Sequence, residues 1–363
     1  MVNRNCCNGK LADCRQIRVA KVYLLDYNYS PRDGCRGTDL PTSSIRSPIL
    51  AGWIENFGPS VRFAESLQKV FIALLARLSG KNATILTLPA GYSSDHRTLR
   101  AAAAAGEFEL VEMPIDGSGH LDLQFMQNLP CPPALVSIPF ADPATGLIMP
   151  LADVFGLASS FPEAFVHIDI TAAIGNAEFE GSVFSADLIT LSAGATGSHS
   201  EESKILILPG NSRLARSVCA ISDPCSPSSA VSDQRFDKAS LLHRHRLRTA
   251  FEDNLLSRIP AAKILFAGVQ RLFNTTAISI YGINAESLTA ILERRGVRAV
   301  ALSLCARTPQ GPYPFFGAAG IPFADTIGAV HLSFGFDVTT AELDAAAAII
   351  ADCTASLRKS GIQ

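Results

Sequence analysis

Residues 166–175, VHIDITAAIG, are the stretch of sequence that says most about the fold. Residues 164–170 are almost wholly apolar, which is typical of a strand buried on both faces of a parallel sheet. Asp169 falls at the carboxyl end of this predicted strand, where open α/β sheets bind their ligands. Its carboxylate could also cap the helical turn predicted to begin at Ile170. The stretch therefore predicts a central strand and leaves both roles open for Asp169.

Strand-like and helix-like segments alternate around this central strand. The other predicted strands are residues 21–26, 83–88, 107–113, 134–139, 186–191 and 204–208. The predicted helices are residues 64–78, 95–105 and 151–159. Such βαβ alternation predicts a mainly parallel sheet with helices on both of its faces.

A second group of elements follows a stretch rich in Ser, Pro and Asp, residues 222–232, which is predicted to be an exposed loop. After it come predicted helices at residues 236–256, 285–295 and 340–358, and predicted strands at 277–281, 297–301 and 329–334. We expect a large sheet domain of residues 48–235. Residues 1–47 and 236–363 are expected to form a small α/β domain.

The composition excludes several classes of protein. Of the 363 residues, 48% are hydrophobic and 18% are charged, which is typical of a globular chain and not of a disordered one. The formal net charge of −2 gives no sign of nucleic-acid binding, and the basic patch at residues 243–246, HRHR, is predicted to lie on a solvated helix face. No apolar run reaches the roughly 18–20 residues that span a bilayer. We therefore expect a cytoplasmic protein that has no membrane or nucleic-acid partner.

The cysteines point to neither a disulfide framework nor a metal site. There are nine of them, an odd number, and none forms a CxxC pair. The cluster of Cys6, Cys7 and Cys14 has no matching His/Cys pair at zinc-ligand spacing, so it is interpreted as incidental. No metal site is expected.

Motifs spread along the chain resemble those of one enzyme family. Residues 166–175 resemble the pattern VHVDAxQxxG, and residues 331–335, HLSFG, resemble RLSxG. Residues 274–276, NTT, and 295–297, RGV, resemble PNT and RG(I/V) in the same order. Together they resemble the class V aminotransferases, especially the branch of cysteine desulfurases and selenocysteine lyases. The resemblance implies the type I fold of pyridoxal-phosphate-dependent transferases, an α/β fold with a mainly parallel sheet in the large domain beside a small α/β domain.

The resemblance also implies pyridoxal phosphate as the cofactor, with Asp169 on its pyridine nitrogen and a lysine in Schiff-base linkage. The family places that lysine at the end of the pattern DLxxxSxHK. Here residues 187–195 read DLITLSAGA, so Gly194 takes the histidine position and Ala195 takes the lysine position. An internal aldimine is therefore not expected. Lys204, the next lysine, is interpreted as a charge at a strand edge that would need a rebuilt loop to reach the cofactor.

The turn that binds the cofactor phosphate in the family is altered as well. It corresponds to residues 63–68, FAESLQ, which open a predicted helix. Ser66 and Gln68 could donate hydrogen bonds to a phosphate. No glycine is present in the turn, however, and Glu65 would repel a dianion.

Two contacts with the cofactor ring differ or stay open. The glutamine that the family has after its aspartate is Ala172 here. Tyr92 and His96 lie in the stretch from which a ring-stacking residue would come. An ordinary core or loop role is an equal alternative for both.

The substrate side of the expected site has changed too. The arginine that binds the substrate carboxylate in the family is His331 here, and a neutral imidazole cannot make the bidentate contact of a guanidinium. Cys305 lies nine residues after Gly296, at the spacing of the nucleophilic cysteine of desulfurases. Its apolar neighbours and the abundance of cysteine make coincidence the alternative. Asp142 is a further candidate cofactor-binding group.

Three functions are consistent with this pattern. The first is a pseudoenzyme, a non-catalytic subunit that forms a homodimer or a heterodimer with an active paralogue. The second is a repurposed active site for an amino-acid-like small molecule, with noncovalent pyridoxal phosphate or none, and its candidate groups are Asp169, Asp142, His331 and Cys305. The third is a pyridoxal-phosphate-dependent lyase, desulfurase or aminotransferase with a relocated lysine. The replacement at Ala195 favours the first two.

Overall fold

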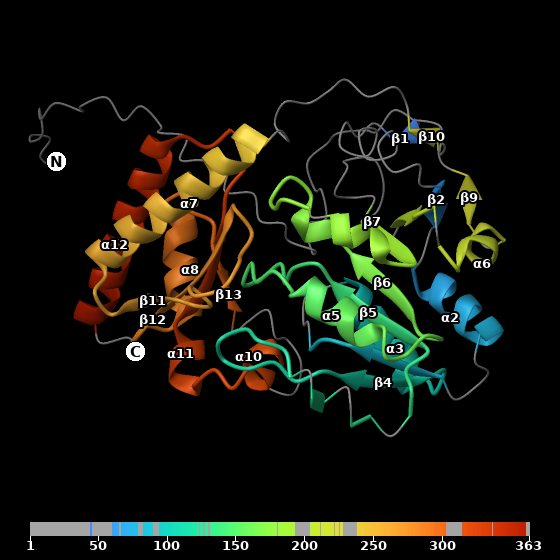
Figure 1. Cartoon of the computed structure of the whole chain (residues 1–363). Coiled ribbons are helices and arrows are strands. Elements are labelled where there is room, and N and C mark those ends of the chain that lie inside the picture. Colours follow the sequence, from blue (N-terminus) through green and yellow to red (C-terminus); the bar gives the residue numbers. More distant parts are fainter. Residues whose placement is uncertain are drawn as a thin grey trace, which may run out of the picture.

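The computed structural model of the chain contains two main β-sheets with helices packed on them (Figure 1). The residues that it describes are 44–45, 60–64, 67–78, 83–89, 94–122, 124–125, 128–129, 131–179, 181–192, 204–210, 212–220, 222–224, 226–227, 238–302, 314–335 and 337–360. The larger sheet lies on the right of Figure 1, and the smaller sheet lies on the left with its helices.

The larger sheet has eight strands in the order β4-β3-β5-β6-β7-β8-β2-β9. Strands β4 to β7 are paired in parallel, whereas β8, β2 and β9 pair antiparallel to their neighbours. The predicted mainly parallel sheet is therefore confirmed, with a mixed edge. Its strands are β2 (Ser60–Ala64), β3 (Thr84–Thr87), β4 (Glu109–Glu112), β5 (Leu135–Pro139), β6 (Phe165–Asp169), β7 (Leu188–Ser192), β8 (Lys204–Leu208) and β9 (Asp223–Pro224).

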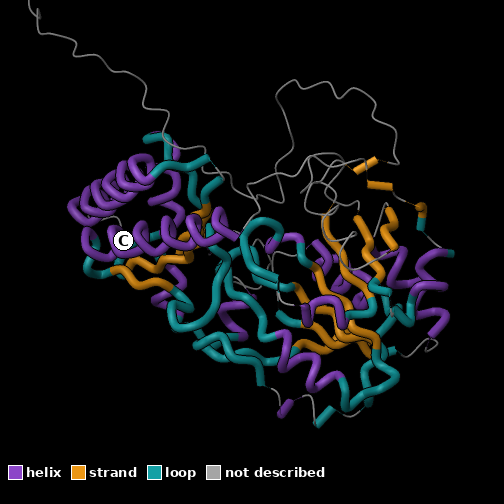
Figure 2. The backbone as a smooth tube through the Cα atoms, turned by 45° about the horizontal axis from the view of Figure 1, so that its top comes forward, coloured by secondary structure: helices purple, strands orange, loops and turns teal. Residues whose placement is uncertain are grey.

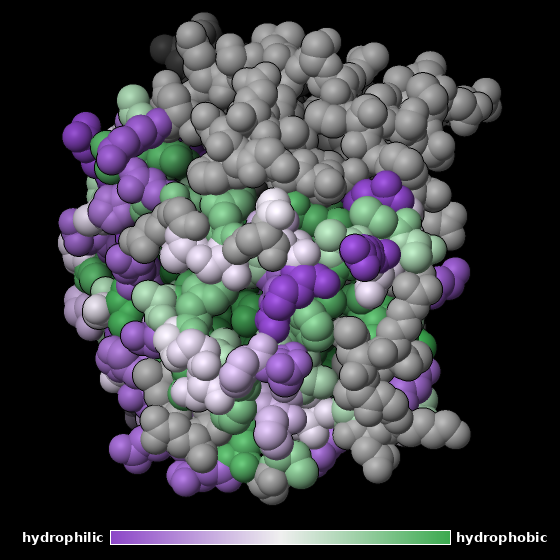
Figure 3. All heavy atoms as spheres, turned by 45° about the vertical axis from the view of Figure 1, so that its right-hand side comes forward, coloured by the Kyte–Doolittle hydropathy of each residue, from purple (hydrophilic) through white to green (hydrophobic). Residues whose placement is uncertain are grey.

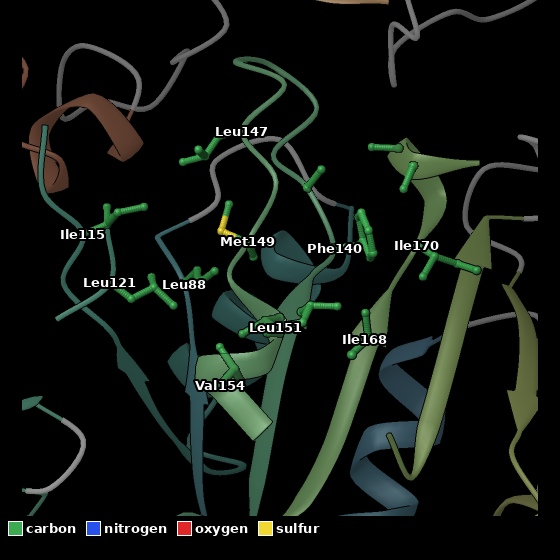
Figure 4. Packing of buried hydrophobic residues seen from close by; sticks show 14 of the residues in the cluster. Leu88, Ile115, Leu121, Phe140, Leu147, Met149, Leu151, Val154, Ile168 and Ile170 are labelled. Atoms are coloured by element: carbon green, nitrogen blue, oxygen red, sulfur yellow. The ribbon is translucent and has the colours of Figure 1, made fainter. Parts of the chain in front are cut away.

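Strand β6 is central because both of its faces are covered. Val166 and Ile168 pack in one cluster with α5 (Leu151–Ala158), and Figure 4 shows Ile168 beside Leu151 and Val154 of that helix. The opposite face of the sheet packs against α2 (Leu67–Leu78) and α3 (Ser94–Ala104). Burial on two faces explains the continuous apolar run in the sequence.

Two predictions for the larger sheet were wrong in detail. The helix predicted at residues 64–78 begins only at Leu67, because residues 60–64 form strand β2. The stretch at residues 222–232, predicted to be a loop, includes β9 and the short strand β10 (Ser226–Pro227). Strand β10 pairs in parallel with β1 (Ser44–Ile45).

The smaller sheet is antiparallel and has the order β11-β12-β14-β13. Its strands are β11 (Ala262–Ile264), β12 (Thr275–Ile280), β13 (Val300–Ala301) and β14 (Ala329–Ser333). Helix α12 (Thr340–Ser360) packs on α7 (Lys238–Arg258) and α8 (Ala285–Arg294), as Figures 1 and 2 show. Shorter helices are α6 (Ala215–Cys219), α10 (Pro314–Ala318) and α11 (Phe323–Ile327). The domain boundaries expected from the sequence stay a prediction.

Helix α7 corrects the interpretation of the basic patch at residues 243–246. Arg244 is buried, with 3% of its surface exposed, and donates a hydrogen bond to the carbonyl oxygen of Gly175. Its burial lowers the pKa of the guanidinium to about 10. Only the other three residues of the patch lie on an exposed face. The patch is therefore not a wholly solvated face, because one of its arginines bonds α7 to the segment that follows β6.

The two sheets meet at the turn that follows β5. The main chain of Gly146 accepts a hydrogen bond from Leu272 N at 2.7 Å, and Ile148 N donates to Gln270 O at 2.9 Å. Gly146 has φ +77°, and a Cβ atom there would lie 3.1 Å from Cβ of Thr275 on β12. Glycine suits both the backbone conformation and the close approach of the two parts.

The described surface in Figure 3 mixes hydrophilic and hydrophobic residues. Among the helices in the described part of the chain, none is long and apolar enough to cross a membrane.

Candidate functional site

The carboxyl end of β6 holds Asp169, the residue that the sequence places at the centre of the site. Its side chain is buried, with 7% exposed. Oδ1 accepts a hydrogen bond from Thr171 N at 2.8 Å and a second one from the Thr171 hydroxyl. Thr171 Oγ1 in turn accepts from Ser192 N, at the end of β7, at 2.9 Å. The two donors stabilise the charge of the carboxylate, and this chain of bonds ties the ends of two neighbouring strands together.

A buried polar row lies beneath Asp169 on the face of the sheet that packs against α2. His167 Nδ1 lies 2.8 Å from Ser137 Oγ on β5, and its Nε2 lies 2.8 Å from Thr190 Oγ1 on β7. The ring of Phe71 on α2 meets the imidazole edge-on, at 5.0 Å between centroids. Strands β5, β6 and β7 are thus joined by side chains as well as by their backbones.

Sequence reasoning assigned no role to Thr171, Ser192 or His167. Thr171 follows the strand-ending aspartate by two residues, which is a spacing at which a hydroxyl can bond the carboxylate. That spacing could have been used to predict the bond between Thr171 and Asp169. The partners of Ser192 and His167 lie on neighbouring strands, so no local pattern could have shown them.

Replacing Thr171 with valine is expected to lower the free energy of unfolding by about 1–3 kcal/mol, because it removes one donor to a buried carboxylate and the acceptor of the Ser192 N–H. The variant Thr171→Ser keeps the hydroxyl and loses only a methyl group, which contributes about 0.8 kcal/mol. Denaturant unfolding of both variants measures the difference. Equal losses for the two variants would show that the hydroxyl does not bind as described.

Asp142 and His331, which are 189 residues apart in the sequence, meet at one turn. Asp142 is fully buried, and its Oδ2 accepts from Thr145 N at 2.7 Å and from Thr145 Oγ1 at 2.6 Å. His331 on β14 has 8% of its surface exposed. Its Nδ1 donates a hydrogen bond to Ala144 O at 2.8 Å. Both side chains therefore stabilise the turn that joins the two sheets.

His96 is on α3, and its side chain meets Glu112 of the edge strand β4. Its ring is buried, and Nε2 lies 3.0 Å from Glu112 Oε1. Arg100 Nε donates to the same oxygen at 2.8 Å. Burial would raise the pKa of Glu112, but the hydrogen bonds from His96 and Arg100 outweigh it and hold the pKa below its usual value. Of the two roles left open, His96 has the contacts of a core residue.

Several predicted site residues lie outside the described residues. These are Ser66, Tyr92, Ala195 and Cys305. Gln68 lies in α2, where the structure describes its backbone but not its side chain. Ala172 is buried in the turn after Asp169. Within the ranges that the structure does describe, no three His, Cys, Asp or Glu side chains come close enough to hold a metal ion.

The donor set at this edge fits the ring end of pyridoxal phosphate. A buried carboxylate held at a strand end, as Asp169 is, is the group that binds a protonated pyridine nitrogen. The cofactor supplies an electron sink when it is bound. Asp169 could hold it there, and the strand register also brings Lys204 to this edge, level with Ser192.

Comparisons with known proteins agree with this reading of the fold. The family model described as aminotransferase class-V matches residues 63–195. A cysteine desulfurase of Sinorhizobium fredii is 27% identical over 264 residues, which cover 69% of this chain and 68% of that protein. One from Cereibacter sphaeroides is 26% identical over 247 residues, covering 64% of this chain and 62% of that protein. The chain thus spans roughly two thirds of the length of these relatives.

Two solved structures have the same fold. A NifS-like protein aligns with a TM-score of 0.62 at 18% identity, over 82% of this chain and 83% of its own. The apo structure of a cysteine desulfurase from Thermococcus onnurineus aligns with a TM-score of 0.62 at 15% identity, over 85% and 82%. These likenesses confirm the predicted fold class.

Proposed function

Because this chain belongs to the family of class V aminotransferases and cysteine desulfurases, we propose that it is a member with a repurposed site, which keeps the family's fold but does not catalyse cysteine desulfuration. Its ligand is a small molecule bound at the carboxyl ends of β6 and β7, next to Asp169. The resemblance that the sequence suggested is confirmed at the level of the family. The loss of the family reaction is the proposal.

The observation that carries the proposal is the bonding of His331. The family resemblance places a substrate-binding arginine there, whereas the imidazole of this chain is buried and donates to the Ala144 carbonyl. A side chain with this bond stabilises the turn and offers no bidentate contact to a substrate carboxylate. The alanine at position 195, where the family has its lysine, supports the same conclusion.

A repurposed site is favoured over an inert subunit by the buried polar groups that the chain keeps. Asp169, Thr171 and Ser192 form a bonded group at the sheet edge, and the buried His167 lies below it. Burying a carboxylate costs free energy that an apolar replacement would avoid. Retaining this group is easier to explain if the edge still binds a polar ligand. The expected dimer, with itself or with a paralogue, stays a prediction.

The test is release of sulfide from cysteine by the purified chain, supplied with pyridoxal phosphate and a thiol reductant. We expect a rate at least about 100-fold below that of an authentic cysteine desulfurase run in parallel, which is the loss typical of one missing general acid–base group. A rate equal to that of the authentic enzyme would refute the proposed function.

A further inference from the structure

A cavity of about 540 Å³ lies between helix α7 and strand β11, which pack against each other in the smaller-sheet part of the chain (Figure 1). Residues of α7 from Arg248 to Leu256 form one wall. Strand β11 and the segment that follows it, as far as Arg271, form the other wall. No lining residue belongs to the larger sheet, so the cavity is separate from the edge that holds Asp169. Its volume is within the range of sites that bind small molecules.

The buried charges that line this cavity do not balance. Arg248 and Arg271 have 6% and 5% of their surfaces exposed, and the buried acid among the lining residues is Glu252. Both Nη atoms of Arg271 donate to the Glu252 carboxylate, and Arg248 Nε lies 3.8 Å from it. Guanidinium groups stay protonated at neutral pH. Two buried positive charges therefore face one buried negative charge.

The hydrogen-bonding capacity of the two arginines is not filled either. Nε of Arg248 and Nε of Arg271 are buried and have no hydrogen-bond partner within the described part of the chain. The Glu252 carboxylate already accepts three hydrogen bonds, two from Arg271 and one from the Thr276 hydroxyl. Buried donors in proteins are nearly always paired, so each exception needs an explanation. A missing anion explains both the unused donors and the excess of positive charge.

The rest of the lining is partly apolar and partly charged. Leu256 on α7 and Ile264 on β11 are half-buried and offer an apolar surface on each wall. The charge of Lys263 is already paired with Asp325. Asp253 would repel an anion, but it is exposed, and water and salt screen the charge of an exposed side chain. The cavity thus combines a buried cationic end with apolar walls.

We propose that this cavity binds a small organic acid, with its carboxylate against Arg248 and Arg271 and its apolar body against Leu256 and Ile264. One carboxylate balances the single excess positive charge. A phosphate dianion would instead leave an excess of negative charge beside the buried Glu252, which is costly. A planar carboxylate also matches the geometry of a guanidinium group. The inference does not depend on the proposed function, because the site and its ligand are different.

The experiment titrates the full chain with isovalerate by isothermal titration calorimetry at constant ionic strength. Isovalerate combines one carboxylate with a branched apolar body. We expect a dissociation constant of about 1 mM or below, which is within reach of a ligand of this size. The uncharged isovaleramide has nearly the same shape and should bind at least about 10-fold more weakly, because it cannot make charge-assisted hydrogen bonds. Inorganic phosphate should also bind more weakly than isovalerate.

Three variants locate the binding without disturbing the buried ion pair. Ala267→Trp adds a large side chain at an exposed lining residue and should weaken binding at least about 10-fold, since it fills part of the cavity. Ala250→Trp is the matched control, because Ala250 is exposed on α7 and does not line the cavity. Asp253→Asn removes the screened repulsion and should tighten binding about twofold. Circular dichroism and thermal unfolding establish that each variant is folded before the affinities are compared.

Four results would overturn the inference: equal affinity for isovalerate and isovaleramide, tighter binding of phosphate than of isovalerate, unchanged affinity in Ala267→Trp, or no binding of isovalerate to the folded chain. Weaker binding in Asp253→Asn would do the same. Sulfide release is measured separately and bears only on the proposed function. The two ideas can therefore fail independently.

Discussion

Replacing Glu252 with alanine is expected to lower the free energy of unfolding by about 3–5 kcal/mol, the loss typical of removing one partner from a buried ion pair. Glu252 on α7 accepts hydrogen bonds from Arg271 Nη1 at 2.7 Å and from Arg271 Nη2 at 2.9 Å. The Thr276 hydroxyl on β12 donates to the same carboxylate at 2.8 Å. All three side chains are buried.

A second cation makes the loss of Glu252 more costly. Arg248 lies one helical turn away, with Nε 3.8 Å from Glu252 Oε1. Burial, and then the charge of Arg271, lower the pKa of Arg248 to about 10. Without Glu252, two buried guanidinium groups would face each other with no carboxylate between them. Arg248 also donates to the carbonyl oxygens of Arg271 and Leu272, so the loss would reach the segment that bonds to the turn of the larger sheet.

The adjacent Asp253 provides the control for this prediction. It lies on the same helix and is exposed. Asp253→Ala is therefore expected to change the free energy of unfolding by less than about 0.5 kcal/mol. Guanidinium unfolding curves of the two variants measure the difference. Similar losses at both positions would mean that the carboxylate of Glu252 is not held between the arginines as described.

The strands that could be predicted from the sequence are those with continuous apolar runs. Strand β8 was predicted with its observed bounds, and β6 and β7 to within two residues. Strand β2 was missed because residues 60–64 owe their conformation to pairing with β8, 140 to 148 residues later. Strand β11, three residues long, is too short to show a period. The missed strands are thus those that depend on a distant partner or are too short to show a pattern.

In the candidate site too, the sequence predicts what local motifs determine and misses what distant contacts determine. The place of Asp169 follows from a local motif and from its position at a strand end. The bond from His331 to Ala144 joins residues 187 apart, and Lys204 pairs with Ser192 because β8 runs antiparallel to β7. Neither contact leaves a periodic pattern in the sequence. The prediction for Arg244 was wrong in a different way. As a charged residue in a basic run it was expected to be solvated, but it is buried.

Replacing Gly328 with alanine is expected to destabilise the chain by about 3 kcal/mol, near the upper end of the usual cost of overpacking. A Cβ atom at this position would lie 2.1 Å from Ile280 O and 2.9 Å from Ile280 C. It would also lie 3.0 Å from Ile283 O. All three contacts are with backbone atoms, so no side chain can rotate away to relieve them.

The expected effect at Gly328 is steric. A second glycine provides the control, because it shows what adding a methyl group does where there is no clash. Gly328 has a negative φ of −96°, which alanine can adopt, and its carbonyl accepts a hydrogen bond from Ile280 N at 3.0 Å. Gly156, inside helix α5, has no atom within 4 Å of a built Cβ. Gly156→Ala should therefore stabilise the chain by about 0.5–1 kcal/mol, because alanine loses less conformational freedom in a helix.

In thermal unfolding, the midpoints of the two variants should shift in opposite directions. A midpoint for Gly328→Ala equal to that of the unmodified chain would mean that β12 and the start of β14 do not approach each other as closely as described.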